Sequence, residues 1–227
     1  ADHRYLHSYP TRRSSDLVGS AHCPLCQSLA RKLPFTKSPL YHCPTCDLIY
    51  KDRLLHLSAD EERRRYEAHD NTLQNEGYVR VFQEFIENAI TPFVEREAAV
   101  LDFGCGPTPV LKELLEERGF TVDAYDPLFA PSPHRIGYNL VTCTEVLEHV
   151  FDPLDTWRRL LSSLSSNGII AVMTHFHPGE AEITNWWYIR DNTHVVFYSA
   201  QTFTWVAQEF NLTILYNDGT KTVVLRN

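Results

Sequence analysis

The spacing of apolar residues in the second half of the chain alternates between two periods. Residues 99–104 (AVLDFG) and 120–126 (FTVDAYD) are short apolar runs with the length of a buried strand. Between them, residues 109–119 (PVLKELLEERG) place valine and leucine at three- and four-residue spacing and end on glycine, which predicts an amphipathic helix. A strand, a helix and a strand in this order form a right-handed parallel unit.

The same alternation continues toward the carboxyl end. The further elements that we expect are a strand at residues 138–143, a helix that starts at Asp152-Pro153, a strand at 169–175, a helix at about 200–210 capped by Ser199, and an antiparallel hairpin around Asn217-Asp218-Gly219. The pattern predicts an α/β fold, with a Rossmann-like, doubly wound, mostly parallel sheet that ends in a C-terminal antiparallel hairpin.

Two cysteine pairs set the amino-terminal part apart from this pattern. Cys23-Pro-Leu-Cys26 and Cys43-Pro-Thr-Cys46 are separated by 16 intervening residues, which lies within the zinc-ribbon range. Each pair can offer two thiolates to one tetrahedral ion, so we expect a small module with a structural Zn²⁺ bound by all four cysteines. Two disulfides are the alternative, and it requires an oxidising compartment for which the sequence gives no sign.

The chain is expected to divide into four segments. Residues 1–17 lack apolar periodicity, and LHSYPTRRSSDL resembles a translated sequencing adapter, so we interpret this segment as a non-native leader. Residues 18–57 form the ribbon-like module, and residues 58–76, which are charged and then polar, form a helical connector followed by a loop. Residues 77–227 form the main domain, which opens with a helix at about 77–90 that has one apolar face.

A glycine-containing loop follows the first parallel strand, where ligands usually bind in such sheets. The loop residues that we expect at a cofactor are Asp102, Gly104, Cys105 and Gly106. Asp126 ends the next strand and is placed to accept hydrogen bonds from ribose hydroxyls. Thr108 lies where a dinucleotide would need a close backbone approach, so a cofactor without a pyrophosphate fits better than NAD.

The segments VLDFGCGPTPVL, VDAYDP and YNLVTCTEVLEHVFDP resemble the successive motifs of class I S-adenosylmethionine-dependent methyltransferases, over about residues 75–227. The resemblance implies that S-adenosylmethionine is the cofactor and that the loop at residues 102–106 holds its methionine end. It also implies that Asp126 binds the ribose and that Thr144 and Glu145 line the site. With the two cysteine pairs, RYEAHDNTLQNEGY and NWWYIRDNTHVVFYS are similar to a bacterial group of zinc-ribbon-bearing methyltransferases.

The segment TCTEVLEHV at residues 142–150 carries candidate catalytic groups. Glu145, Glu148 and His149 would share one face if the segment were helical. The segment is similar to the E-x-x-E-H element of ubiquinone-pathway O-methyltransferases, in which matching residues bind a divalent metal, so the resemblance implies a possible Mg²⁺ at these three side chains. A general base or substrate-positioning role for His149, and a purely structural role for the segment, remain alternatives.

A second candidate patch, NWWYIRDNTHVVFYS, follows the fourth strand. The side chains that we expect at the substrate are Trp186, Trp187, Tyr188, Arg190 and Tyr198, as an aromatic wall and an anion-binding group. His194 is the second candidate catalytic histidine, which would accept a proton as the methyl group is transferred. Aromatic residues at this density are also typical of a core, so packing is the alternative interpretation.

Composition and charge narrow the class of partner. No apolar run approaches the roughly 20 residues of a membrane span, so we expect a cytoplasmic protein without a membrane partner. Residues 1–65 hold 11 Lys and Arg against 7 Asp and Glu, whereas residues 66–227 hold 10 against 22. An acidic main domain repels phosphate backbones, which disfavours nucleic acid as a partner.

These observations predict methyl transfer from S-adenosylmethionine to a small-molecule acceptor, with zinc in a structural role. The reaction would be an in-line displacement in which the cofactor supplies the leaving group and the protein orients the nucleophile. Two alternatives remain: an RNA base methyltransferase whose ribbon recognises nucleic acid, and a non-catalytic zinc-ribbon binding protein on the same fold.

Overall fold

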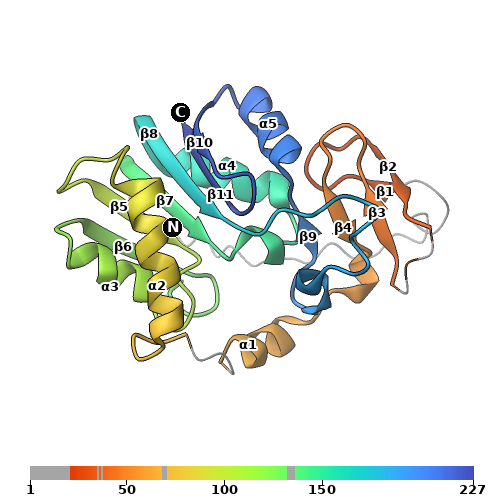
Figure 1. Cartoon of the computed structure of the whole chain (residues 1–227), viewed down its shortest axis with the longest axis horizontal. Helices are drawn as coiled ribbons and strands as arrows, with labels where there is room; N and C mark the ends of the chain where they lie inside the picture. The colour runs from red at the N-terminus through yellow and green to blue at the C-terminus, as the bar shows by residue number, and fades with distance from the viewer. Residues whose placement is uncertain (1–20, 35, 37, 68–70, 132–135) are drawn as a thin grey trace, which may run out of the picture.

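The computed structural model shows two β-sheets that lie side by side (Figure 1). The described residues are 21–34, 36, 38–67, 71–131 and 136–227. The predicted leader at residues 1–17 lies outside them. Within the described residues, no helix combines the length and the apolar character that crossing a membrane requires.

The larger sheet has the strand order β10-β11-β8-β7-β5-β6. Its strands are β5 (Ala99–Phe103), β6 (Thr121–Tyr125), β7 (Tyr138–Thr144), β8 (Leu164–Met173), β10 (Thr213–Asn217) and β11 (Thr222–Arg226). The four strands from β6 to β8 pair in parallel, and β11 and β10 add an antiparallel hairpin at one edge. The predicted fold class is confirmed. β8 begins earlier than expected, because Leu164 pairs with Tyr138 across an irregularity in the register.

Helices cover both faces of this sheet. One face carries α2 (Glu76–Phe85), its π-helical extension (Ile86–Ile90) and α3 (Val110–Glu116), and the other carries α4 (Pro153–Ser163) and α5 (Ala200–Glu209). Successive strand residues serve the two faces, since Val100 packs with α2 and α3 and Leu101 packs with α4 and α5. Ser199 caps α5 through a capping box with Thr202, as its position in the sequence predicted.

The smaller sheet combines the four strands that flank the cysteine pairs with one strand from the main domain. Its amino-terminal strands are β1 (Ala21–His22), β2 (Leu29–Lys32), β3 (Leu40–His42) and β4 (Ile49–Lys51), all antiparallel. The fifth strand is β9 (Val196–Phe197), which pairs with β4 through Ile49 and Tyr50. The ribbon is therefore joined to the main domain by backbone hydrogen bonds, which the sequence did not predict.

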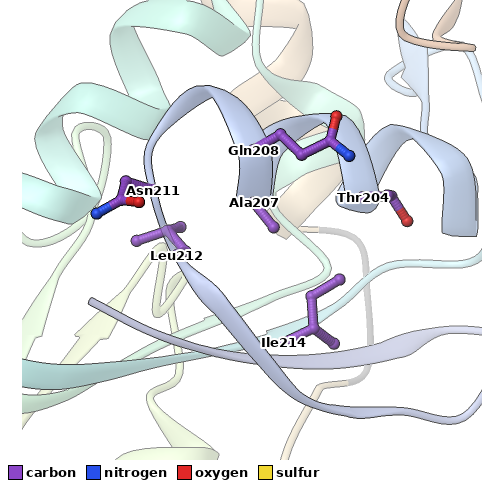
Figure 2. Close-up of a pocket in the computed structure, with 6 residues that line it drawn as sticks. All are labelled: Thr204, Ala207, Gln208, Asn211, Leu212 and Ile214. Atoms are coloured by element: carbon purple, nitrogen blue, oxygen red, sulfur yellow. The ribbon is translucent and has the colours of Figure 1, made fainter.

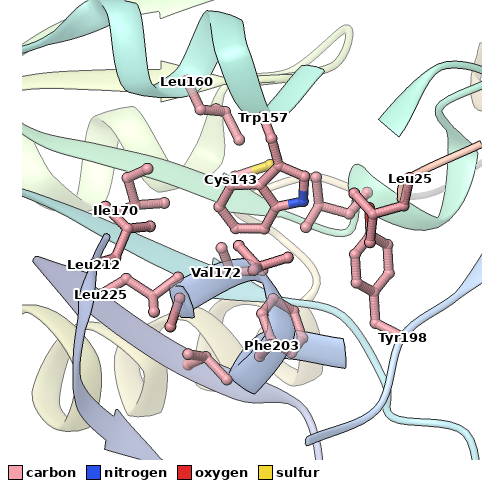
Figure 3. Packing of buried hydrophobic residues seen from close by; sticks show 14 of the residues in the cluster. Leu25, Cys143, Trp157, Leu160, Ile170, Val172, Tyr198, Phe203, Leu212 and Leu225 are labelled. Atoms are coloured by element: carbon pink, nitrogen blue, oxygen red, sulfur yellow. The ribbon is translucent and has the colours of Figure 1, made fainter. Parts of the chain in front are cut away.

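The two sheets also share one hydrophobic core. Leu25 of the ribbon is fully buried in the same cluster as Trp157 of α4, Phe203 of α5 and Tyr198 (Figure 3). Burying a leucine side chain contributes about 1.5–3 kcal/mol relative to leaving it exposed. Ribbon and main domain are thus expected to unfold together rather than as independent modules.

Candidate functional site

The loop after β5 is bound to the end of β6 by backbone hydrogen bonds. The amide of Gly104 donates to the carbonyl oxygen of Tyr125 over 2.7 Å, and the amide of Gly106 donates to Oδ2 of Asp126 over 3.1 Å. Oδ1 of Asp126 accepts from the amides of Leu128 at 2.8 Å and Phe129 at 3.1 Å. These three amides fix the orientation of the carboxylate, which has about four acceptor positions and so retains capacity for a ligand.

The two glycines of the loop have different surroundings. Gly104 has a φ of +81°, and a Cβ placed on it would lie 2.3 Å from Cγ2 of Val146. Gly106 has a φ of +66°, and a Cβ placed there would meet nothing within 4 Å. The sequence suggested that both glycines allow a ligand to approach the backbone. In the structure Gly104 accommodates a protein side chain, and the open side of the loop is at Gly106.

Asp102 and Cys105 lie in low-dielectric surroundings beside this loop. Asp102 is buried and accepts a hydrogen bond from Oγ1 of Thr142 over 3.0 Å. Burial raises the pKa of Asp102 to about 6, and the nearby carboxylate of Asp126 adds to the effect. Burial, together with Asp102 and Asp126, also raises the pKa of Cys105 to about 12, so its thiol is neutral at pH 7.

The raised pKa of Asp102 predicts a measurable pH dependence. In the folded protein the pKa of Asp102 is about 6, against an ordinary 3.8, so folding favours the protonated carboxyl group. The contribution of Asp102 to the free energy of unfolding is therefore complete below about pH 4 and is lost as the pH rises to about 6. At about 1.4 kcal/mol per pKa unit, the loss of stability is about 3 kcal/mol.

The variant Asp102→Asn tests this expectation, because asparagine cannot ionise and still offers an oxygen to Thr142. Without ligand it should match the wild type near pH 4 and be more stable by about 3 kcal/mol at pH 7 in urea denaturation. Parallel pH profiles for the two proteins would contradict the shift.

The segment after β7 does not form the helical face that the sequence suggested. Glu145 has a φ of +53°, and only Leu147–His149 forms a short 3-10 turn, η3. Glu148 is fully buried beneath it. The hydroxyl of Tyr188 contacts Oε2 of Glu145 at 3.0 Å and Oε1 of Glu148. Burial and the charge of Glu148 raise the pKa of Glu145 well above its ordinary range.

Two histidines complete this cluster. Nδ1 of His149 lies 3.2 Å from the carbonyl oxygen of Thr193, and Nδ1 of His194 lies 2.8 Å from that of Tyr188. The two imidazole centroids are 4.7 Å apart. Burial, with a contribution from His149, lowers the pKa of His194 to about 4, so His194 is neutral at pH 7. The structure thus brings the two predicted patches together, and the amide of Val195 donates to the carbonyl oxygen of Glu148 over 2.7 Å.

The remaining predicted substrate residues are placed differently. Tyr198 lies fully buried in the core shared with the ribbon, stacked on Phe203, and the structure does not bring it to the histidine cluster. Trp186 packs on Phe197 and Tyr188. Trp187 and Arg190 are exposed at the two ends of one 3-10 turn (Trp187–Arg190), and Trp187 lies 5.1 Å from the ring of His175. Thr144 is buried at the end of β7.

Helix α1 (Ala59–Glu67), within the predicted connector, packs over the same region. Its Tyr66 ring lies edge-on to His149 with centroids 5.3 Å apart, and the guanidinium of Arg63 lies 5.1 Å from the ring of Phe129. Burial, with the charge of Asp126 adding to it, raises the pKa of Glu62 to about 7. Sequence reasoning gave this helix only a connecting role, and the spacing of Arg63 and Tyr66 on one helical face was the available signal.

The ribbon contacts the segment that carries His194. Nζ of Lys51 donates to the carbonyl oxygen of Asp191 over 2.7 Å, and the amide of Lys51 donates to the carbonyl oxygen of Val195 over 2.8 Å. Oδ2 of Asp47 accepts from the hydroxyl of Ser199 over 2.6 Å. The ribbon therefore holds both ends of residues 191–199.

The four ribbon cysteines converge on one point. Their Sγ atoms lie within 4.8 Å of one another, with 3.5 Å between Cys23 and Cys46 and 3.3 Å between Cys26 and Cys43. Four thiolates about 2.3 Å from a tetrahedral Zn²⁺ would be about 3.8 Å apart, so the donor set and its spacing fit zinc. All four cysteines are free thiols in the structure, which disfavours the disulfide alternative.

Two surface pockets of the described residues lie away from this region. One, of about 320 Å³, lies between α5 and β10 and is lined by Thr204, Ala207, Gln208, Asn211, Leu212 and Ile214 (Figure 2). Another, of about 850 Å³, is lined by residues 91–96 together with Glu117, Arg118 and Phe120. Neither pocket is lined by a residue of the glycine loop or the histidine cluster, so neither is a candidate for the chemistry.

Comparison with known proteins agrees with this architecture. The family model described as methyltransferase domain matches residues 65–217. The 1,6-didemethyltoxoflavin-N1-methyltransferase of Burkholderia thailandensis has a similar fold, with 14% identity, a TM-score of 0.54, and coverage of 82% of this chain and 98% of that one. A SAM-dependent methyltransferase from Archaeoglobus fulgidus has 13% identity and a TM-score of 0.52 over 74% and 99% of the two chains.

Two further comparisons limit what can be inferred about this chain from its similarity to known proteins. A match to coclaurine N-methyltransferase, at 15% identity and a TM-score of 0.42, spans 66% of this chain and about half (52%) of that one. No curated protein matches the chain significantly. Because the family model extends from α1 to the end of β10, and solved methyltransferases have a similar fold, the chain belongs to the methyltransferase domain family and carries an S-adenosylmethionine-dependent methyltransferase domain.

Proposed function

We propose that this protein transfers the methyl group of S-adenosylmethionine to a small-molecule acceptor, at a site between the glycine loop and the histidine cluster. The observation that supports this proposal is the convergence at the carboxyl edge of the parallel strands. Asp102 lies near the end of β5 and the loop at residues 104–106 follows it, Asp126 follows β6, and the segment with Glu148 and His149 follows β7. Ligands of open α/β sheets bind at this edge.

The residues of the glycine loop fit the cofactor. Gly106 leaves the loop open on one side, and Asp126 is oriented by three backbone amides with capacity to accept hydrogen bonds from ribose hydroxyls. Asp102, at the base of the loop, offers a carboxyl group for the methionine end. When bound, S-adenosylmethionine supplies an activated methyl group and its own leaving group. The protein's contribution is then to orient the acceptor and to exclude water.

The histidine cluster provides for the proton that the acceptor loses. His194 is neutral at pH 7, and its Nδ1–H donates to the carbonyl oxygen of Tyr188, so Nε2 carries the lone pair that can accept a proton. Tyr66 of α1 packs edge-on against His149, where it would help to exclude water from this side of the site. His149, His194, Glu145 and Glu148 are therefore our candidates for catalysis.

The position of the ribbon favours a small acceptor over RNA. Its last strand is paired with β9, and Leu25 and Leu48 are buried in the shared core together with Cys23, Cys43 and Cys46, so these side chains serve packing. The Burkholderia methyltransferase of similar fold has 1,6-didemethyltoxoflavin bound, which is an analogy at the level of the fold only. Trp187, with 57% of its surface exposed beside His175, offers an aromatic face to an acceptor at the rim.

Cofactor binding is the first test. S-adenosylhomocysteine titrated into the wild-type protein should bind with one site in calorimetry. Ligand at about 100 times its dissociation constant should add about 2.7 kcal/mol of stability in a thermal melt. Asp126→Ala should lose this binding, because the ribose loses its acceptor and Gly106 loses its partner. Asp155→Ala, which removes an exposed carboxylate paired with Arg159 on α4, is the matched control and should bind normally.

The acceptor class is tested with the same preparation and methyl-labelled cofactor. A cell extract separated into small molecules, RNA and protein should take up label in the small-molecule fraction, and Asp126→Ala should abolish that uptake. Label confined to RNA would replace our proposal by the RNA alternative. No binding of S-adenosylhomocysteine by a folded wild-type protein would favour the non-catalytic alternative.

A further inference from the structure

Glu148, His149 and His194 form a compact group of metal-ligating side chains. One ligand atom of each lies within 4.8 Å of the other two. Glu148 and His149 come from η3, and His194 comes from the segment before β9, so the chain brings them together from positions far apart in sequence. Glu145, which the E-x-x-E-H resemblance would include, is not part of this group. It lies against the hydroxyl of Tyr188.

The backbone fixes the tautomer of both imidazoles. A carbonyl oxygen can only accept, so the nitrogens beside the carbonyls of Thr193 and Tyr188 carry protons. Nδ1 is therefore protonated in both His149 and His194, and in the neutral form of each ring Nε2 is the nitrogen that can bind a metal. Metal-binding histidines are typically held in this way, with the second ring nitrogen donating to a carbonyl or carboxylate.

Glu148 supplies an independent observation. Its side chain is 0% exposed, and Oε1 takes the contact with Tyr188. Oε2 is buried and has no hydrogen-bond partner among the described residues. Leaving a buried carboxylate oxygen unsatisfied is costly, and such groups are usually paired or coordinate a metal. Oε1 of the same carboxylate lies 3.8 Å from Nε2 of His149, so an ion bound by Glu148 and the two imidazoles would compensate the buried charge.

We propose that Glu148, His149 and His194 bind one divalent first-row transition-metal ion, separate from the zinc of the ribbon. Two imidazoles and one carboxylate suit Zn²⁺, Fe²⁺, Co²⁺ or Mn²⁺, whereas Mg²⁺ prefers a shell of oxygen ligands. The metal and its ligand set thus differ from the Mg²⁺ site at Glu145, Glu148 and His149 that the sequence suggested. The role of the ion rests on the proposed function: it would bind an oxygen of the acceptor and lower the pKa of its hydroxyl. It would do so in place of proton acceptance by His194, because it would occupy the Nε2 lone pair of that ring.

The alternative to a metal ion is a proton shared by Glu145 and Glu148, which would also compensate the buried charge of Glu148. The experiment that separates the two begins with protein that retains one Zn²⁺ per chain in the ribbon. Mn²⁺ is then titrated, and the loss of the free Mn²⁺ signal in electron paramagnetic resonance is followed beside calorimetry. We expect one Mn²⁺ per chain, displaced by Zn²⁺ and not by an excess of Mg²⁺. The shared proton predicts no Mn²⁺ binding, which would overturn the inference.

Four variants locate the site. His194→Ala and Glu148→Gln should weaken Mn²⁺ binding by about 100-fold or more, since loss of a direct ligand should exceed the effect of an outer-shell change. Glu145→Gln should retain the ion, and so should His175→Ala, which removes a nearby imidazole outside the group. Loss of binding in Glu145→Gln with retention in His194→Ala would overturn the ligand set that we propose.

Folding and function are monitored separately from the metal. Each variant is melted with and without S-adenosylhomocysteine, and His194→Gln replaces His194→Ala if the latter does not fold. A wild-type protein that binds S-adenosylhomocysteine but no Mn²⁺ contradicts the metal site alone. One that binds Mn²⁺ but no S-adenosylhomocysteine contradicts the proposed function alone.

Discussion

Replacing Cys43 by serine should release the ribbon metal and lower the free energy of unfolding of the whole chain by more than about 4 kcal/mol. Loss of a structural metal is among the few single changes with an effect of this size, because metal affinity is part of the folding free energy. The effect should reach beyond the ribbon. Leu25 is buried against the main domain's core, and β4 pairs with β9, so the ribbon cannot unfold without exposing apolar surface of α4 and α5.

The same substitution should disturb the segment at residues 191–199, which carries His194. Lys51 holds the backbone at Asp191 and Val195, and these residues flank His194. Hydrogen exchange of the Val195 and Phe197 amides should therefore accelerate in Cys43→Ser at temperatures at which the protein is still folded. Cys143→Ala is the matched control, because it removes a buried thiol outside the metal site and should keep one zinc per chain. A zinc-free Cys43→Ser protein that melts like the wild type would refute the structural role of the ribbon.

The second large effect is expected at Gly104. Gly104→Ala would place a methyl group 2.3 Å from Cγ2 of Val146, at a φ of +81° that L-residues rarely adopt. Overpacking costs about 1–3 kcal/mol and the strained backbone about 1 kcal/mol or more, so we expect a loss of about 2–4 kcal/mol in urea denaturation. Val146 is β-branched and cannot swing away, so the loop itself must move. S-adenosylhomocysteine binding should be lost with it.

Gly106→Ala provides the comparison within the same loop. Its Cβ would meet no atom within 4 Å, so only the backbone strain at a φ of +66° remains, about 1 kcal/mol. The double variant Gly104→Ala with Val146→Ala should recover part of the stability, because it removes the two methyl groups nearest to the new Cβ. Equal losses for the two single variants would show that the contact with Val146 does not control the loop.

Several features were predictable because they depend on local spacing. Apolar residues at two periods predicted the strands and helices of the larger sheet, and Ser199 was identified as a cap from its position alone. The two Cys-x2-Cys pairs predicted a four-cysteine cluster, because each pair offers two thiolates from one turn. Motif spacing also placed the glycine loop and Asp126 after neighbouring parallel strands. In the structure the amide of Gly106 in this loop donates a hydrogen bond to the carboxylate of Asp126.

Other features depend on contacts between residues far apart in the chain, and no local pattern encodes them. The pairing of β4 with β9 joins residues about 150 positions apart, and a two-residue strand has no periodicity to detect. Tyr198 carried the same aromatic signal as Trp187, yet one is buried in the shared core and the other is exposed. His194, rather than Glu145, joins Glu148 and His149, because Glu145 adopts a left-handed backbone and its side chain meets Tyr188. The sequence by itself determined the Rossmann-like α/β fold and the cysteine cluster, since both follow from period and spacing, and its resemblance to family motifs indicated a methyltransferase. Only the tertiary structure decided which side chains meet at the site, since that depends on burial and on long-range packing.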